Sequence, residues 1–320
     1  MLLTACLLAG VIALAWANGA NDTGKPVATL VASGAWRPRP ALLAAAGAGL
    51  LGSVAAIWWA ADLSALFAGR GLVDERTRSL AAFAPSLTIG AAGAVLAAGL
   101  LGLPVSTTHA LIGAMIGSAL AGGGQIAWSA IASKVAGPLL LAPLLAVAVG
   151  GVLVMAMRRW GGRGRFSQAL HRLCALAIAA ARGLQDAPKI AALLVPALAV
   201  PAAGSGWLMV MVGVAIAGGG VLAGSRVLGV MSTRLVQIDG RDAEAAGASL
   251  GAAALLFTAT PLALPVSTTH VTTSALVSAG LGGGLSWRWL GGILLAWVTT
   301  LPAASLAGAG AMLALGRFGG

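Results

Sequence analysis

The amino-acid sequence predicts an all-α polytopic membrane protein built from two inverted repeats, with broken or re-entrant helices and about ten or more membrane segments. Composition, a series of long apolar runs and a duplicated polar motif lead to this prediction. Of the 320 residues, 59% are hydrophobic and only 8% are charged, and the mean hydropathy is +0.97. A water-soluble domain of this composition would expose large apolar patches, so we expect most of the surface to face lipid.

The apolar runs have the length that a membrane requires, since a spanning helix needs about 20 largely apolar residues. Short clusters of Arg, Asp, Gly and Pro separate them. The first and sixth runs are too long for one simple crossing and contain Pro26 and Pro188, so we expect broken helices there. The predicted segments are 2–35, 41–61, 80–101, 104–121, 130–157, 174–200, 206–223, 244–263, 265–283 and 289–315.

The net charge of +11 would suggest nucleic-acid binding in a soluble chain, but the arginines here lie between apolar runs. Membrane topology explains them better, and no nucleic-acid partner is expected. Residues 158–173 carry several arginines and no acid, which predicts a cytoplasmic basic linker between a first membrane repeat, 1–157, and a second, 174–320. Both termini are then expected outside, in a multi-pass protein of the cell inner membrane.

A duplicated motif divides the chain into two related halves. Leu-Pro-Val-Ser-Thr-Thr-His occurs at Leu103–His109 and again at Leu264–His270, and Asp22-x-x-Lys25 recurs as Asp186-x-x-Lys189. An odd number of crossings in each half would place the halves in opposite orientations. This is the plan of inverted-repeat secondary transporters.

Asp22 and Asp186 are the only carboxylates expected at membrane depth, because the other six acids lie in or at the edge of predicted loops. A charged side chain at the membrane centre costs about 2.5 to 3.5 kcal/mol, which makes both functional candidates. Asn21 and Gln185 precede them, and with the nearby Gly and Pro they have the composition of an unwound helix that coordinates a coupling cation such as sodium. A buried polar contact that merely ties helices together is the alternative.

Lys25 and Lys189 follow the two aspartates at the same spacing. An ammonium group at membrane depth could neutralise the neighbouring carboxylate, contact a bound anion, or stand where another carrier holds a cation, and the sequence leaves these roles open. Arg182 could add a bidentate contact to an oxyanion, or it could reach toward the cytoplasmic surface.

The Pro-Val-Ser-Thr-Thr-His blocks predict helix starts, whose amino termini attract anions. Two such starts, at Pro104 and Pro265, would surround an anion with N–H and O–H donors, although the same hydroxyls could also bind a cation. The histidines His109 and His270 could carry a coupling proton or be structural imidazoles. The candidate anion-binding hydroxyls are those of Ser106, Thr107, Thr108, Ser267, Thr268 and Thr269.

Gly19–Asp22, the two Pro-Val-Ser-Thr-Thr-His blocks and Gly224–Leu228 together resemble the inorganic phosphate transporter family over nearly the whole chain. The resemblance implies a cation:phosphate symporter with inverted repeats, often a homodimer. The residues that it places along the phosphate and sodium sites are Asn21, Asp22, Ser106, Thr107, Thr108, Asp186, Ser267, Thr268 and Thr269.

The chain departs from this family where Lys25 replaces a common Asn and where Gln185-Asp186 replaces a common Asn-Asp. It therefore looks like a short prokaryotic branch with Asp-x-x-Lys in both halves, and the coupling ion is left as sodium or a proton. A carrier of sulfate or another oxyanion and a passive anion channel are the alternatives. No enzyme activity is expected, because nothing resembles a nucleophile elbow around Ser106 or Ser267. No cofactor is expected either.

Overall fold

The computed structural model describes residues 1–59, 61–160, 164–195, 198, 206–260, 262, 264 and 266–318, and all named elements in this part of the chain are helical. The first half forms α1 (Leu2–Asp22), α2 (Ala28–Ala32), α3 (Pro38–Trp59), α4 (Ala61–Phe67), α5 (Glu75–Arg78), α6 (Phe83–Leu100), α7 (Thr107–Ala121), α8 (Trp128–Ile131) and α9 (Gly137–Trp160). The second half forms α10 (Arg165–Ala191), α11 (Gly206–Ala223), α12 (Ser225–Gly229), α13 (Asp242–Ala259), α14 (Thr268–Gly280) and α15 (Trp287–Leu315).

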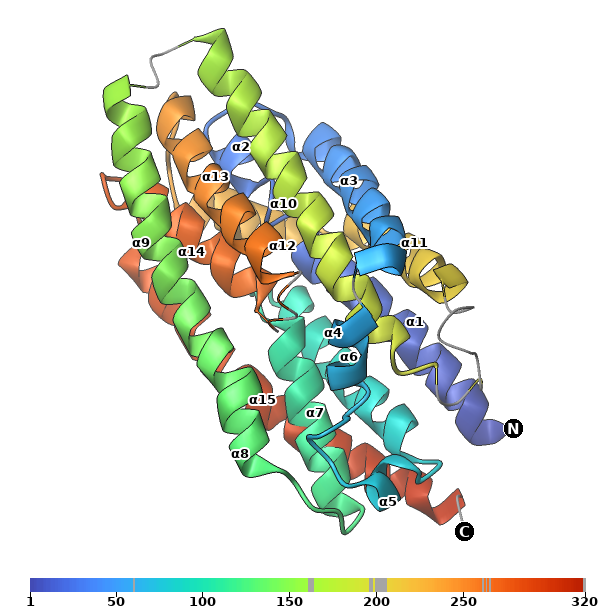
Figure 1. Cartoon of the computed structure of the whole chain (residues 1–320). Coiled ribbons are helices and arrows are strands. Elements are labelled where there is room, and N and C mark those ends of the chain that lie inside the picture. Colours follow the sequence, from blue (N-terminus) through green and yellow to red (C-terminus); the bar gives the residue numbers. More distant parts are fainter. Residues whose placement is uncertain are drawn as a thin grey trace.

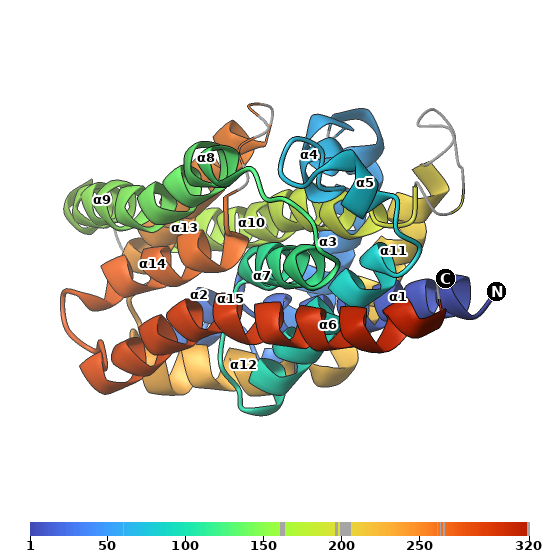
Figure 2. The ribbon, with the colours of Figure 1, turned by 90° about the horizontal axis from the view of Figure 1, so that it is seen from below.

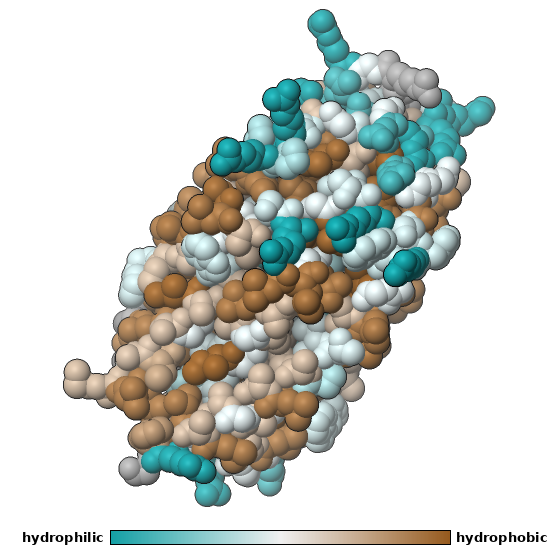
Figure 3. All heavy atoms as spheres, turned by 180° about the vertical axis from the view of Figure 1, so that it is seen from behind, coloured by the Kyte–Doolittle hydropathy of each residue, from teal (hydrophilic) through white to brown (hydrophobic). Residues whose placement is uncertain are grey.

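Among the described residues, six helical stretches are long and apolar enough to cross a membrane: α1, α3, α6, α11, Trp128–Trp160 and Trp287–Phe318. Their outward side chains are apolar, and Leu140, Val298 and Leu306 are 71%, 73% and 76% exposed. Apolar residues cover much of the middle of the molecule in Figure 3. This surface fits a bilayer rather than water. The larger number of segments expected from hydropathy stays a prediction.

The helices α7 and α14, with 15 and 13 residues, are too short to cross. At 1.5 Å per residue they extend about 20 Å, against about 30 Å of hydrocarbon. The hydroxyls of Ser106 and Ser267 cap their first turns by accepting the N–H groups of His109 and His270, both at 3.2 Å. The predicted start at Pro104 is wrong, because Ser106 is the extended capping residue and α7 begins after it; Pro265 lies outside the described residues.

Of the two helix breaks predicted at prolines, only the first is found. The helix α1 ends at Asp22, and a turn containing Pro26 leads into α2. The break predicted at Pro188 is wrong, since α10 continues to Ala191. Proline is tolerated there because it lies in the last turn, where the missing N–H deprives only the carbonyl of Leu184 of its helical partner.

The first half of the chain leads from one end of the molecule to the other, and the second half leads back (Figure 1). The helix α1 starts at the end where both termini and α5 lie, whereas α9 ends and α10 begins at the far end. Figure 2 also places the two termini at one end, with α15 lying across α6 and α7. The basic segment 158–173 belongs mostly to the helices that meet at the far end, because α9 reaches Trp160 and α10 begins at Arg165.

The helices of the two halves pack against each other, and the same contacts occur twice. Each of the main contacts of a helix in one half has an equivalent made by its counterpart in the other half. The helix α1 packs on α11, and its counterpart α10 packs on α3. Likewise α7 packs on α15, and α14 packs on α9. Each half therefore buries its own polar motifs against long helices of the other half.

Glycines bring the crossing helices close together, as is typical of membrane proteins. A Cβ atom on Gly183 of α10 would lie 2.7 Å from the carbonyl carbon of Gly49 in α3. In the equivalent contact, a Cβ atom on Gly19 of α1 would lie 2.9 Å from the backbone nitrogen of Gly220 in α11. Both crossings depend on the absence of a side chain.

We expect Gly183→Ala to destabilise the fold by about 1 to 3 kcal/mol, because the added methyl group meets backbone atoms that cannot turn aside. The measurement is the thermal unfolding midpoint of the purified protein in detergent. Gly151→Ala is the matched control, since a Cβ atom there has nothing within 4 Å, and its midpoint is expected to be unchanged or higher. Equal midpoints for the two variants would contradict the close crossing.

Candidate functional site

A cluster of buried polar side chains lies where the end of α1, the C-terminal part of α10 and the first turns of α7 and α14 meet. Its charged members are 1–3% exposed. Such burial is costly unless the charges are paired and hydrogen-bonded. We call this cluster the polar centre, and it consists of Asn18, Asp22, Thr23, Lys25, Thr107, Thr108, Arg182, Asp186, Lys189 and Thr269.

Lys25 lies among three kinds of oxygen atom. Its Nζ donates to Oδ1 of Asp22, to the carbonyl of Val105 at 2.8 Å and to Oγ1 of Thr269 at 2.6 Å. The Thr269 hydroxyl in turn donates to the same Val105 carbonyl at 2.9 Å.

Lys189 has the equivalent surroundings. Its Nζ donates to Oδ1 of Asp186 at 3.4 Å, to Oγ1 of Thr108 at 3.3 Å and to the carbonyl of Val266 at 3.4 Å. The ring of Phe67 lies 5.5 Å from the ammonium group, within cation–π range. In both sets the carboxylate and carbonyl come from the lysine's own half and the threonine comes from the other half.

Asn18 and Arg182 join the two sets. The Asn18 amide nitrogen lies 3.1 Å from Oδ2 of Asp22 and 3.3 Å from Oδ2 of Asp186, and it also donates to Thr107 at 3.0 Å. Arg182 donates to Oδ1 of Asn18 at 2.6 Å and to Thr23 at 3.2 Å, and its Nε lies 3.2 Å from Oδ2 of Asp186. The two carboxylates therefore belong to one network.

Sequence reasoning did not single out Asn18 or Thr23 as site residues. The signal for Asn18 was present, because it precedes Asp22 by four residues and so lies on the same face of α1. Thr23 offered no such signal, since it follows the end of α1 and its side-chain direction depends on the turn.

The charges of the polar centre do not balance. Two lysines and one arginine face two aspartates, which leaves one positive charge in excess within the buried cluster. An uncompensated charge away from water is unfavourable by several kcal/mol. The arrangement is therefore suited to binding an anion, with threonine hydroxyls as additional donors.

Asn21 and Gln185 lie beside the polar centre rather than within it. The Asn21 side chain donates to the carbonyl of Leu103 at 2.9 Å and accepts the N–H of Val105 at 3.1 Å. Gln185 donates to Oγ1 of Thr260 at 3.1 Å. Both amides thus hold the segments that lead toward α7 and α14, and their predicted role as cation ligands stays a prediction.

His109 and His270 lie together, with ring centroids 4.7 Å apart, and His270 contacts the ring of Trp297 at 3.9 Å. The indole nitrogen of Trp297 donates to the carbonyl of Pro104 at 2.9 Å. The histidines line a mostly apolar cavity of about 510 Å³ between α9 and α15, and their proton-carrying or structural role stays a prediction.

The other hydroxyls predicted to bind an anion have simpler positions. Ser106 and Ser267 accept backbone N–H groups as helix caps. Thr268 is buried in the first turn of α14, next to Thr269. The other three hydroxyls contact the charged groups of the polar centre: Thr107 donates to Asp22, Thr108 accepts from Lys189 and Thr269 accepts from Lys25.

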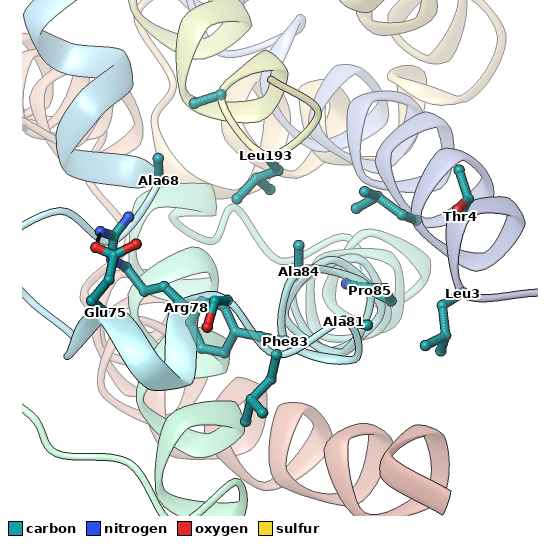
Figure 4. A pocket seen from close by; sticks show the side chains of 14 residues that line it. Leu3, Thr4, Ala68, Glu75, Arg78, Ala81, Phe83, Ala84, Pro85 and Leu193 are labelled. Carbon is teal, nitrogen blue, oxygen red and sulfur yellow. Dashed lines mark hydrogen bonds and ion pairs between the residues drawn. The ribbon is translucent and has the colours of Figure 1, made fainter. Parts of the chain in front are cut away.

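A second hollow of about 450 Å³ lies near the amino terminus (Figure 4). It is lined by Thr4, Glu75, Ala68 and Leu193 among others, and Thr4 and Glu75 are exposed. Phe67, next to Ala68, is completely buried with its ring over Lys189. Neighbouring residues of one segment thus line the hollow and contact the polar centre.

A helical membrane protein with an anion-attracting polar centre shared by two interlocked halves is typical of membrane transporters. The chain belongs to the phosphate transporter family: the family model of that description matches residues 18–171 and 163–308. It is thus a member of a transporter family and not of an enzyme family.

Curated relatives agree with this assignment. The chain is 34% identical over 323 residues to a probable low-affinity inorganic phosphate transporter of Mycobacterium bovis, covering 95% of this chain and 76% of the relative. It is 29% identical over 326 residues to a protein of the same name from Rhizobium meliloti, covering 94% of each. Among solved structures, one titled "The sodium-dependent phosphate transporter" has a TM-score of 0.83 at 19% identity and covers 99% of this chain and all of that one.

Proposed function

We propose that the chain carries inorganic phosphate across the cell inner membrane as a cation-coupled symporter, driven by sodium or protons, and that it works by alternating access. The excess positive charge of the polar centre carries the proposal, because it calls for an anion at membrane depth. Membership of the phosphate transporter family supports phosphate as that anion.

Phosphate would bind between the first turns of α7 and α14. The threonines Thr107, Thr108 and Thr269 lie there, beside Lys25 and Lys189. Helix amino termini add backbone N–H groups and a favourable dipole for an anion. A tetrahedral oxyanion needs donors from several directions, which two helices entering from opposite halves would supply.

The two halves would form inverted repeats, 1–157 and 174–320, joined by the basic linker 158–173. Two observations support this arrangement: counterpart helices make equivalent contacts, and α1 and α10 start at opposite ends of the molecule (Figure 1). The arginines of the linker would lie in the cytoplasm, with both termini outside. A homodimeric assembly, implied by the family resemblance, stays a prediction.

The hollow near the amino terminus would be part of the outer access route. Phe67 would close the inner end of this route by covering Lys189, and rocking of the halves would uncover the lysine. The substrate would then be exposed to one side of the membrane at a time, as alternating access requires.

The test is uptake of radiolabelled phosphate into proteoliposomes that contain the purified chain, with imposed sodium or proton gradients. We expect uptake against the phosphate gradient that arsenate inhibits and an excess of sulfate does not. Flux that only follows the phosphate gradient would support a passive channel, and sulfate-inhibited uptake would support a general oxyanion carrier. Absence of both uptake and binding would overturn the proposal.

A further inference from the structure

The oxygen atoms best suited to an alkali cation are already occupied by lysine side chains. Sodium sites in carriers use carboxylate, carbonyl and hydroxyl oxygens near unwound helices. Lys25 takes one oxygen of each kind, from Asp22, Val105 and Thr269. A sodium ion in this position would meet a fixed ammonium group, so the residues of this set do not fit sodium.

The equivalent site of the second half is filled in the same way. Lys189 again takes a carboxylate oxygen three residues before it, a valine carbonyl of its own half and a threonine hydroxyl of the other half. Val105 and Val266, and likewise Thr108 and Thr269, are equivalent positions of the duplicated motif. Two sets of contacts that match atom for atom indicate a built arrangement rather than two unrelated salt bridges.

Charge also specifies which form of phosphate fits. The polar centre has one positive charge in excess, so a singly charged anion makes the occupied site neutral, whereas a doubly charged anion leaves it negative. The charged groups facing the site are Asp22 at the end of α1, Lys25 in the turn after it, and Arg182, Asp186 and Lys189 from α10. The titratable groups on α7 and α14 are His109 and His270, which contact each other.

We infer that Lys25 and Lys189 act as built-in counter-cations, and that the chain carries singly charged dihydrogen phosphate without a bound sodium ion. The inference rests on the proposed function and selects between its coupling ions. The proton travels on the substrate itself: H₂PO₄⁻ enters the site, and after release it divides into HPO₄²⁻ and H⁺. A pH difference, acidic on the side of uptake, can then drive accumulation without a separate proton site.

The decisive comparison is phosphate uptake by proteoliposomes in sodium medium and in medium where choline replaces sodium on both sides. We expect the rates to agree within about twofold. Between about pH 8 and about pH 6, where phosphate gains its second proton, the rate at fixed total phosphate should rise severalfold. Counting of radioactive sodium should find no sodium entering with phosphate.

Variants of the lysines provide an independent readout. Lys25→Asn frees the oxygen atoms of Asp22, Val105 and Thr269 that Lys25 occupies. We expect this variant to lose uptake in choline medium and to bind sodium. Sodium binding would be detected as a sodium-dependent rise in the thermal unfolding midpoint, which the unchanged protein lacks. Lys134→Asn is the matched control, because Lys134 is exposed and lies outside the polar centre, and it should behave as the unchanged protein.

The outcomes separate the inference from the function on which it rests. Uptake that falls more than about tenfold without sodium, or sodium that enters together with phosphate, would overturn the built-in counter-cations and leave phosphate transport intact. Absence of phosphate uptake in every medium would instead overturn the proposed function. If Lys25→Asn does not fold, the sodium counting on the unchanged protein still decides.

Discussion

Asp22→Asn should reduce phosphate uptake at least about 100-fold, because breaking a buried charge pair on one side costs about 3 to 5 kcal/mol. The Asp22 carboxylate accepts from Lys25, from Asn18 at 3.1 Å and from Thr107 at 3.4 Å. Both carboxylate oxygens accept hydrogen bonds. In asparagine one of them is replaced by an NH₂ group, so in either orientation of the amide this NH₂ group faces another donor. The measurement is the initial uptake rate in proteoliposomes at equal protein content.

Asp74→Asn is the control for charge removal. The carboxylate of Asp74 accepts the N–H groups of Gln125 and Thr77 outside the membrane helices, and these bonds hold its pKa below the ordinary value of 3.8. It is therefore charged at neutral pH, and its loss should weaken only the cap of α5. Equal uptake losses in the two variants would contradict a special role for Asp22.

A double variant separates transport from folding. Asp22→Asn with Lys25→Met removes the charge pair together, so the folded protein no longer holds an unpaired ammonium group. We expect a monodisperse gel-filtration peak and a recovered unfolding midpoint, with uptake still absent. Recovery of uptake would show that the pair is only structural.

Arg182→Gln should raise the KM for phosphate by about 10-fold to 100-fold, because it removes the excess positive charge of the polar centre and the fork that joins Asn18 to Thr23. Arg182→Lys keeps the charge but loses the planar fork, so its KM should lie between those of Arg182→Gln and the unchanged protein. The measurement is uptake over a range of phosphate concentrations at fixed pH.

Arg234→Gln is the matched control, since Arg234 is exposed and stacks on Trp289 outside the polar centre. Its KM should not change. If Arg182→Gln lowered only the maximal rate and left KM unchanged, Arg182 would act on the movement of the halves rather than on anion binding. That result would also count against charge balance as the basis of substrate selection.

Much of the polar centre could be predicted from the sequence because charged residues inside apolar runs must find partners. Asp22 and Asp186, their lysines and the threonines of the duplicated motif do lie together. The duplication itself was the strongest signal. It indicated that residues 161 or 164 positions apart in the chain occupy equivalent places, before any contact between them was known.

Backbone contributions could not be predicted in the same way. The carbonyls of Val105 and Val266 complete the lysine sites, but their direction depends on where α7 and α14 begin. The helix start was expected at Pro104, yet the extended conformation of Ser106 moves it toward Thr107. Likewise, Pro188 was expected to break α10, and its place in the last turn removes that need.

Each lysine takes its threonine from the opposite half of the chain. A single half therefore has the carboxylate and carbonyl of a site but lacks the hydroxyl that completes it. A half of the chain on its own could complete its site only by pairing with a second half. Because each lysine donates to a threonine of the other half, neither half can move past the other without breaking the lysine–threonine hydrogen bonds of both sites at once.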